Sequence, residues 1–302
     1  MARNKFDPIT LEVLWNRLIS TVNEQAAALM HASFTTVVRE AGDLSAGVFD
    51  EQGNMLAQAV TGTPGHINTM ATCVRHFIKE YPIKTLKKGD TLITNDPWLA
   101  SGHLHDFTIV TPVFHQGRAV GLFANTCHVM DIGGRIFGAD ANSVYEEGLA
   151  IPIMKLVDRG QMNEDLVKII RANVRTPEPV LGDVHAMVAA NEVGAKKLIE
   201  MMEDHRLSDL NDLSTAIIDR SEQSMRKAIR NIPDGTVQHQ IEVDGFDEPI
   251  IIKLAITVDG DRIIADYAGT SPQSSRGINV VYNYCHAYTT YPIKCSVSPE
   301  SP

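Results

Sequence analysis

Residues 95–134 read NDPWLASGHLHDFTIVTPVFHQGRAVGLFANTCHVMDIGG, and this stretch decides how the middle of the chain folds. Two apolar runs, at 107–114 and 118–127, are separated by the short segment HQG, a pattern that predicts a β-hairpin. Five side chains able to bind a metal ion surround these runs: His103, His105, Asp106, His128 and Asp131. We therefore expect a metal site at this hairpin.

The register of the hairpin decides which of these side chains meet. A three-residue loop at 115–117 would place Asp106 opposite Thr126, with His128 as its diagonal neighbour on the same face of the sheet. A two-residue turn would instead pair His105 with His128. From the sequence alone, both registers stay open.

His103 lies just before the first strand, where the Ser101-Gly102 bend can turn its imidazole toward the same point. Two imidazoles and one carboxylate suit Zn²⁺, Mn²⁺ or Fe²⁺ and leave positions open for water or substrate. Such an ion lowers the pKa of bound water and polarises a carbonyl group. The competing interpretation is that these histidines only form hydrogen bonds with loop backbone.

Composition narrows the class of protein to which such a site can belong. A hydrophobic fraction of 44% and a charged fraction of 21% over 302 residues indicate a soluble globular protein, and a net charge of -10 argues against nucleic acid as the main partner. No segment approaches the ~20 apolar residues that a membrane span needs. The four cysteines are far apart and form no CxxC pair, which predicts a reducing, cytoplasmic setting.

The pattern before the hairpin predicts helices alternating with short strands. Asp7-Pro8 is typical of a helix start, and apolar residues then recur at helical spacing as far as Leu29. Short strand-like runs follow on either side of a hairpin loop at 50–53, and a second helix is predicted over about residues 67–80. The run TLIT at 91–94 predicts a strand that leads into the hairpin stretch.

After the hairpin we expect helices at 163–174, 180–204 and 208–230, followed by an antiparallel β meander beyond Pro233. The fold class is therefore α+β, with mixed or antiparallel sheets and hairpins. We predict a metal-site domain with the helical block over residues 1–232 and an antiparallel β region over 233–302. A strand-like run containing Tyr291 and Cys295 ends close to residue 302, which predicts an N-terminal fragment of a longer protein, incomplete at its C-terminus.

Several motifs occur together in one order along most of the chain. They are REAGDLS at 39–45, NDP at 95–97, HLHD at 103–106, TPVF at 111–114, HVMDIGG at 128–134, and EGL with IP at 147–152. This series resembles the hydantoinase B/5-oxoprolinase family, which includes the related subunits of acetone and acetophenone carboxylases.

The resemblance implies a metal centre whose ligands correspond to His103, Asp106 and His128. Where the family commonly has proline this chain has His105, which leaves the ligands intact and adds a further imidazole. The chain contains neither a G-x-x-x-x-G-K-[ST] nor a G-x-G-x-x-G phosphate motif. The resemblance accordingly implies that ATP and Mg²⁺ are bound by a separate hydantoinase A-like subunit in a hetero-oligomer.

Other polar residues of the motifs have two interpretations each. Asp43 is either a further ligand or proton-transfer group, or it caps a turn. Asp131 either orients the ring of His128 or stabilises its own loop. Asp96 either supports a ligand or forms an ordinary turn, which we favour. Cys127 alternates away from His128 and is predicted to be a small buried residue.

These observations lead to three hypotheses of function. The first is the metal-bearing subunit of an ATP-dependent cyclic amide hydrolase that opens a hydantoin, 5-oxoproline or a related lactam, with Asp43 and Asp131 as candidate catalytic residues. The second is a subunit of an ATP-dependent carboxylase of the acetone or acetophenone type. The third is a non-catalytic assembly subunit in which the hairpin histidines are structural.

Overall fold

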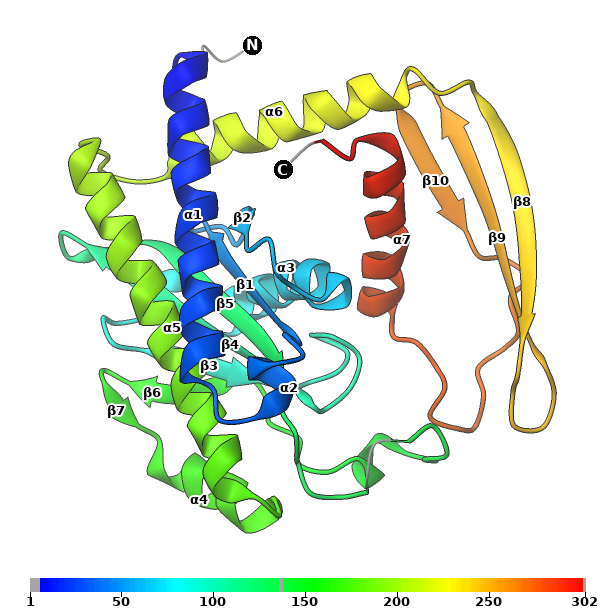
Figure 1. The fold of residues 1–302 in the computed structure, drawn as a ribbon, viewed down its shortest axis with the longest axis horizontal. Coiled ribbons are helices and arrows are strands. Elements are labelled where there is room, and N and C mark those ends of the chain that lie inside the picture. Colours follow the sequence, from blue (N-terminus) through cyan, green and yellow to red (C-terminus); the bar gives the residue numbers. More distant parts are fainter. Residues whose placement is uncertain (1–5, 136–137, 301–302) are drawn as a thin grey trace.

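The computed structural model describes residues 6–135 and 138–300 and is built around a seven-stranded antiparallel sheet (Figure 1). The strand order is β2-β1-β5-β4-β3-β6-β7, so the β4–β5 hairpin lies in the middle of the sheet. The strands are β1 (Leu44–Phe49), β2 (Met55–Gln58), β3 (Thr91–Thr94), β4 (Asp106–His115), β5 (Arg118–His128), β6 (Met154–Asp158) and β7 (Gln161–Met162).

Helices cover both faces of this sheet. The long helices α1 (Pro8–Ala32) and α5 (Pro177–Asp204) pack against each other and cross one face, while α3 (Pro64–Glu80) packs on the other. Two hydrophobic clusters result, one on each side, and β1 is buried along its whole length because both of its faces are covered. The prediction of an α+β fold is confirmed.

The first helix begins where the sequence predicts. The Asp7 carboxylate accepts hydrogen bonds from the backbone of Ile9 at 3.0 Å and of Thr10 at 3.1 Å, and Pro8 occupies the first turn, where its missing N–H costs nothing. Short elements complete this part of the chain: α2 (Thr36–Arg39), α4 (Glu164–Asn173) and the 3₁₀ turns η1 (Ile83–Thr85) and η2 (Val144–Glu146).

The β4–β5 hairpin combines a two-residue turn with a β-bulge. Gln116 and Gly117 both have positive φ, 48° and 83°, the backbone that a two-residue hairpin turn requires. The residues on either side of this turn, His115 and Arg118, pair directly. The register then shifts between Val113 and Phe114, because Val120 is an extra residue on β5. Beyond the bulge, each residue of β4 pairs with a β5 residue one position later in the sequence than a regular two-residue turn would give.

Because of this bulge, the observed register differs from both registers that the sequence analysis considers. The three-residue loop is wrong, and so is the pairing of His105 with His128 that a regular two-residue turn would impose. Asp106 instead pairs directly with His128. The expectation that these two side chains share one face of the sheet is confirmed, although they are opposite rather than diagonal neighbours.

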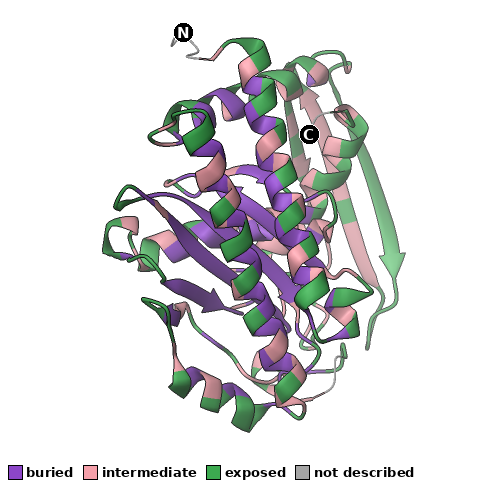
Figure 2. Ribbon diagram, turned by 60° about the vertical axis from the view of Figure 1, so that its left-hand side comes forward, coloured by how far each residue is buried: buried purple, intermediate pink, exposed green. Residues whose placement is uncertain are grey.

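After α6 (Asn211–Ile229) the chain forms a separate three-stranded sheet of β8 (Gly235–Val243), β9 (Ile250–Asp259) and β10 (Arg262–Asp266). This is the predicted antiparallel meander. None of its residues is fully buried, in contrast to the strands of the larger sheet (Figure 2). The division into residues 1–232 and 233–302 stays a prediction.

The strand predicted around Tyr291 and Cys295 is wrong. The segment forms α7 (Tyr282–Val297), which returns to pack on α3 beside the large sheet (Figure 1). Its aromatic residues favour a strand locally, but the segment packs on α3 as a helix in which Ala287 is buried. Residues 301–302, where the chain ends, lie outside the described residues. Among the helices that the structure describes, none is both long and apolar enough to span a membrane.

A buried amide network ties α1 and α5 to the sheet. The side-chain oxygen of Asn191 accepts hydrogen bonds from Gln25 and Asn125, each at 2.7 Å, and its nitrogen donates to the Thr111 hydroxyl at 3.1 Å. Gln25, Asn125 and Asn191 are all fully buried. Each therefore depends on the others for hydrogen bonds that water cannot supply.

We predict that Asn191→Leu lowers the free energy of unfolding by about 2–4 kcal/mol, because the buried donors of Gln25 and Asn125 lose an acceptor. Urea unfolding followed by circular dichroism measures the change. Glu192→Ala, at the next, exposed position of the same helix, is the matched control and should alter stability by less than about 0.5 kcal/mol. Equal stability of Asn191→Leu and the wild type would contradict the structural role of the network.

Candidate metal centre

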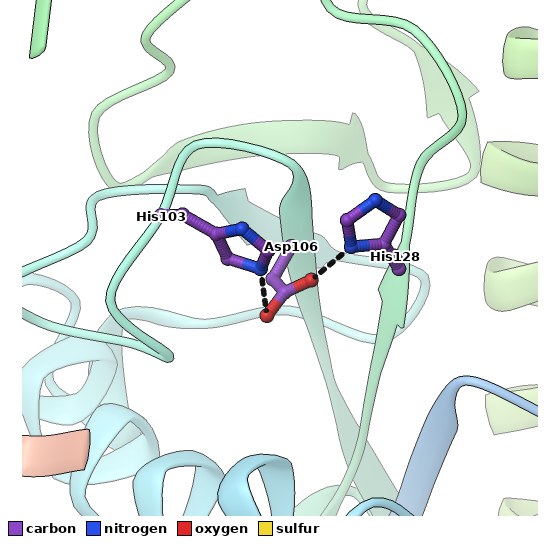
Figure 3. Close-up of side chains that lie close together, drawn as sticks. All are labelled: His103, Asp106 and His128. Carbon is purple, nitrogen blue, oxygen red and sulfur yellow. Dashed lines mark hydrogen bonds and ion pairs between the residues drawn. The ribbon is translucent and has the colours of Figure 1, made fainter. Parts of the chain in front are cut away.

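The candidate centre lies at the end of the β4–β5 hairpin opposite its turn (Figure 3). Asp106 is the first residue of β4, His128 is the last residue of β5, and His103 belongs to the loop between β3 and β4. One ligand atom from each of these three residues lies within 4.8 Å of the others. The structure thus brings together the three side chains that the sequence predicts as a ligand set.

Both histidines point their nitrogens at the carboxylate of Asp106. His103 Nε2 lies 2.7 Å from Asp106 Oδ2, and His128 Nδ1 lies 3.2 Å from Asp106 Oδ1. The Asp106 side chain is fully buried, whereas 24% of the His103 side chain and 19% of the His128 side chain are exposed. The centre is therefore closed on the carboxylate side and accessible on the imidazole side, as a site with open ligand positions requires.

Polar hydrogens surround the buried carboxylate. Besides the two imidazoles, the Ser101 hydroxyl donates to Asp106 Oδ2 at 2.5 Å, and His66 Nε2 lies 2.8 Å from the same oxygen. Burial opposes ionisation of Asp106, but the charge of His66 and the histidine hydrogen bonds outweigh it and hold its pKa well below the usual value. Asp106 is therefore an anion in this site.

The surroundings of His103 favour its protonated form. Burial disfavours its protonated form, yet the hydrogen bond and charge of Asp106, followed by the charges of Glu147 and Asp43, raise its pKa above the usual value. A nitrogen that binds a metal ion must be deprotonated, so an ion at this position would compete with that proton.

His66 is a member of the centre that the sequence reasoning missed. It lies in the first turn of α3 and its side chain is almost fully buried, 4% exposed. Its spacing to Met70, Cys73 and Val74 places it on the apolar face of that helix, toward the sheet. The sequence signal that could have identified His66 is its position on the buried face of the predicted helix. The predicted helix start at residue 67 left His66 out by one position.

His105 supports the ring of His128. The two imidazoles stack with their centroids 5.1 Å apart and an interplanar angle of 9°. Burial, and then the positive charges of His128 and His103, lower the pKa of His105 to about 4. A neutral imidazole at position 105 therefore packs against a candidate ligand.

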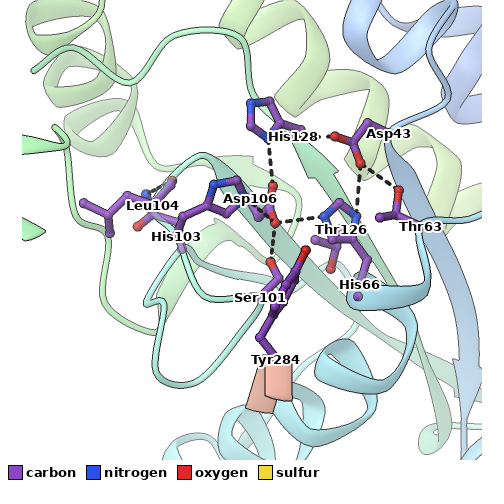
Figure 4. Close-up of polar contacts among 12 residues, drawn as sticks. Asp43, Thr63, His66, Ser101, His103, Leu104, Asp106, Thr126, His128 and Tyr284 are labelled. Atoms are coloured by element: carbon purple, nitrogen blue, oxygen red, sulfur yellow. Dashed lines mark hydrogen bonds and ion pairs between the residues drawn. The ribbon is translucent and has the colours of Figure 1, made fainter. Parts of the chain in front are cut away.

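Asp43 lies beside the centre, immediately before β1 (Figure 4). Its Oδ2 is 3.9 Å from His128 Nδ1, its Oδ1 is 3.7 Å from His66 Nδ1, and Oδ1 also accepts a hydrogen bond from the Thr63 hydroxyl at 2.7 Å. Its side chain is 34% exposed, more than that of either imidazole it approaches. This position suits a further ligand or a proton acceptor, and its role stays a prediction.

The loop that carries His103 is held on both sides. Glu147 Oε2 accepts a hydrogen bond from the backbone of Leu104 at 3.0 Å, and Asn95 Nδ2 donates to the Leu104 carbonyl at 2.7 Å. Asn95 Oδ1 in turn accepts from the backbone of Ile151 at 2.6 Å. Side chains and backbone from three of the ordered motifs therefore fix one another around the centre.

Comparison with known proteins identifies the family of this chain. The family model described as Hydantoinase B/oxoprolinase matches residues 7–302. The chain belongs to the hydantoinase B/oxoprolinase family. The resemblance that its ordered motifs indicate is confirmed, and the match includes every residue of the candidate centre.

Three relatives define the extent of the similarity. A protein from Pseudomonas sp. (strain NS671), described as the B component of a putative D-/L-hydantoinase, is 31% identical over 283 residues, which cover 89% of this chain and 48% of that protein. The structure of ATP-dependent caprolactamase from Pseudomonas jessenii is 28% identical, has a TM-score of 0.86, and matches over 96% of this chain and 51% of its own. A nucleotide-free acetone carboxylase structure, 17% identical, shares the fold over 98% of this chain and 42% of its own, with a TM-score of 0.87. This member of the hydantoinase B/oxoprolinase family thus spans about half the length of these relatives.

Asp131 binds the beginning of α5. Its carboxylate accepts hydrogen bonds from the backbone of Gly133 at 3.0 Å and of Thr176 at 3.1 Å, and from the Arg175 guanidinium at 2.9 Å. Burial opposes its ionisation, but these backbone and Arg175 hydrogen bonds lower its pKa. The contacts support the loop-stabilising interpretation, and a catalytic role or a bond that orients His128 stays a prediction.

Two further interpretations are supported by the structure. The Asp96 carboxylate accepts a hydrogen bond from the backbone of Trp98 at 2.9 Å, so it forms the turn that the sequence favours. Cys127 is fully buried in the core between the sheet and α5, and burial raises its pKa well above the usual value. It behaves as a small apolar residue, as predicted.

We predict that Asp106→Asn destabilises the metal-free chain by about 3 kcal/mol near pH 7, because it leaves buried imidazoles without their anion. A carboxylate with a lowered folded-state pKa contributes stability above its unfolded pKa of about 4 and loses it as the pH falls through the folded value. The difference between wild type and variant should therefore be largest at neutral pH and shrink below about pH 4.

Urea unfolding at a series of pH values measures this difference. The matched control is Asp165→Asn, whose carboxylate is 88% exposed and pairs with Lys168 at 3.1 Å. It should change stability by less than about 0.5 kcal/mol at every pH. A constant offset between Asp106→Asn and wild type from pH 7 to pH 3 would contradict the assignment of Asp106 as a buried anion.

Proposed function

We propose that this chain is the metal-bearing subunit of an ATP-dependent amidohydrolase that opens a hydantoin, 5-oxoproline or a related cyclic amide. The observation that carries the proposal is the convergence of His103, Asp106 and His128 at a partly exposed position at the end of the β4–β5 hairpin. Relatives named as a hydantoinase component and a caprolactamase support an amide ring as the substrate. In this proposal ATP is held by a partner subunit.

The residues present fit a divalent ion. Two imidazole nitrogens and one carboxylate oxygen are within reach of one another, Asp106 is anionic, and both imidazoles are partly exposed. This donor set suits Zn²⁺ or Mn²⁺, and Fe²⁺ as well. When bound, such an ion polarises the reacting carbonyl and makes a water molecule more acidic.

The protein's own residues have distinct tasks in the proposed reaction. His66 and Ser101 donate to Asp106 and fix its orientation, which in turn fixes the nitrogens of His103 and His128. Orientation by such partners is what keeps a reactive centre preorganised. Asp43, beside His128, is placed either to hold the ion as a further ligand or to accept a proton from the attacking water.

The chemistry balances with two water molecules and one ATP for each ring opened. The partner transfers a phosphoryl group from ATP to the amide oxygen, which activates the ring carbon. A first water adds to that carbon, the bond between carbon and ring nitrogen breaks, and the nitrogen takes up a proton, which leaves an acyl phosphate. A second water hydrolyses the acyl phosphate to the carboxylate and phosphate. The products are the ring-opened amino acid, ADP and phosphate.

We expect the chain to retain roughly one Mn²⁺ or Zn²⁺ per molecule after incubation and dialysis, measured by elemental analysis. His103→Ala and His128→Ala should each lower metal affinity by about 100-fold, because each removes a ligand. His105→Ala is the matched control: it removes a neighbouring imidazole that stacks on His128 and should retain the ion. Loss of metal in the control alone, or binding by none of the proteins, would contradict the assigned ligand set.

Reaction products separate the proposed function from its rivals. With the ATP-binding partner, ATP and a hydantoin or 5-oxoproline, we expect ATP-dependent release of the ring-opened amino acid, detected by mass spectrometry. His128→Ala should abolish this release while the complex still assembles. Carboxylated product from acetone and bicarbonate would favour the carboxylase instead, and activity that survives His128→Ala would favour a structural subunit.

A further inference from the structure

Helix α7 brings residues from the last part of the chain to the candidate centre. Its first turn is attached to the loop before His103, because Asn283 Nδ2 donates to the Trp98 carbonyl at 2.7 Å. Its middle is attached to α3, because Asn68 Nδ2 donates to the Thr290 hydroxyl at 2.8 Å. The helix is therefore fixed to both of the segments that supply histidines from this side of the site.

Two glycines lie against this helix: Gly65 leaves room for the rings of Tyr284 and Tyr288, and Gly102 contacts Val281 and Tyr284. A Cβ atom on Gly65 would lie 2.6 Å from Tyr284 Cε2, and one on Gly102 would lie 3.5 Å from Tyr284 Cβ and 3.2 Å from Val281. Gly65 immediately precedes His66, and Gly102 immediately precedes His103. The Tyr284 ring thus lies between the two backbone segments that carry these imidazoles.

The hydroxyl end of Tyr284 is directed into the centre. Figure 4 shows the ring beside Ser101, with its oxygen toward the side where Asp106 and His66 lie. The hydrogen bond of this hydroxyl goes to Tyr288 at 3.4 Å, close to the limit for a bond between two oxygens. Such a long bond is easily exchanged for a shorter one to a ligand.

The phenol is a neutral donor. Burial, the Tyr288 hydrogen bond and the negative charges of Asp106 and Asp43 all raise the pKa of Tyr284. A phenol held between rigid segments can therefore donate to an oxygen without itself becoming charged, which is the usual role of a tyrosine in a ligand pocket.

We propose that Tyr284 is a substrate-binding residue of this centre, whose hydroxyl donates a hydrogen bond to an oxygen of the ligand held at His103, Asp106 and His128. The ligand class is one that presents a carbonyl or related oxygen toward α7, as a cyclic amide does. The inference rests on the proposed function because it needs a ligand at that position. It also makes residues beyond 233 part of the site.

The test uses Co²⁺ as a visible probe of the metal centre and acetohydroxamate as a small amide-like ligand. The full chain is loaded with Co²⁺, and acetohydroxamate is titrated while the Co²⁺ absorption bands are followed. Tyr284→Phe removes only the hydroxyl and keeps the ring between the glycines. Tyr288→Phe is the matched control, because it removes a hydroxyl from the same helix, one whose oxygen lies 3.4 Å from that of Tyr284.

We expect Tyr284→Phe to take up Co²⁺ as the wild type does and to bind acetohydroxamate about 10-fold more weakly, the effect of one lost hydrogen bond. Tyr288→Phe should bind it with wild-type affinity. The thermal unfolding temperatures of all three proteins should agree. Weaker ligand binding by Tyr284→Phe then reflects the lost hydroxyl and not a change in packing.

Two contrary results differ in what they overturn. If the wild type takes up Co²⁺ normally but Tyr284→Phe binds acetohydroxamate equally well, or neither protein binds it, the role of Tyr284 is overturned while the metal site stands. If the wild type takes up no Co²⁺, the proposed function fails and the inference fails with it.

Discussion

The buried carboxylate of Asp106 is the interaction on which the rest of the centre depends. An ionised group without access to water is costly unless charges and hydrogen bonds compensate it. Here His66, His103, His128 and Ser101 all approach its two oxygens within hydrogen-bonding distance. These donors come from α3, from the loop before β4 and from the end of β5, so a single anion sets the relative positions of three segments.

The bulge at Val120 makes this arrangement compatible with a continuous hairpin. Side chains alternate between the two faces of a strand, so a shift of one residue changes which of them meet. The turn at Gln116 and Gly117 would by itself pair His105 with His128, whereas the extra residue on β5 pairs Asp106 with His128. His105 then packs against the ring of His128, where burial and its charged neighbours keep it neutral. The bulge therefore decides that Asp106, and not His105, lies directly opposite His128.

The helices on both faces of the sheet hold the site in place and leave one side of it exposed. The sheet is covered by α1 and α5 on one side and by α3 on the other, and the amide network around Asn191 links the first pair of helices to the central strands. At the end of the hairpin this cover is incomplete, so His103 and His128 remain partly exposed. Helix α7 lies beside this end, with Tyr284 against Gly65 and Gly102. A site formed in this way combines well-anchored candidate ligands with limited access for a small molecule.

The sequence by itself determined the helix start at Asp7, the central hairpin and the meander beyond Pro233, because capping, alternation and turn signals are local. The set His103, Asp106 and His128 is a prediction that the ordered family motifs imply. The sequence did not determine the hairpin register, since a bulge has no residue signature of its own and is selected by packing on both faces of the sheet. Only the tertiary structure placed His66 and α7 at the centre. Their contacts join segments far apart in the chain, and the buried charge of Asp106 and the surface of α3 exist only once the chain has folded.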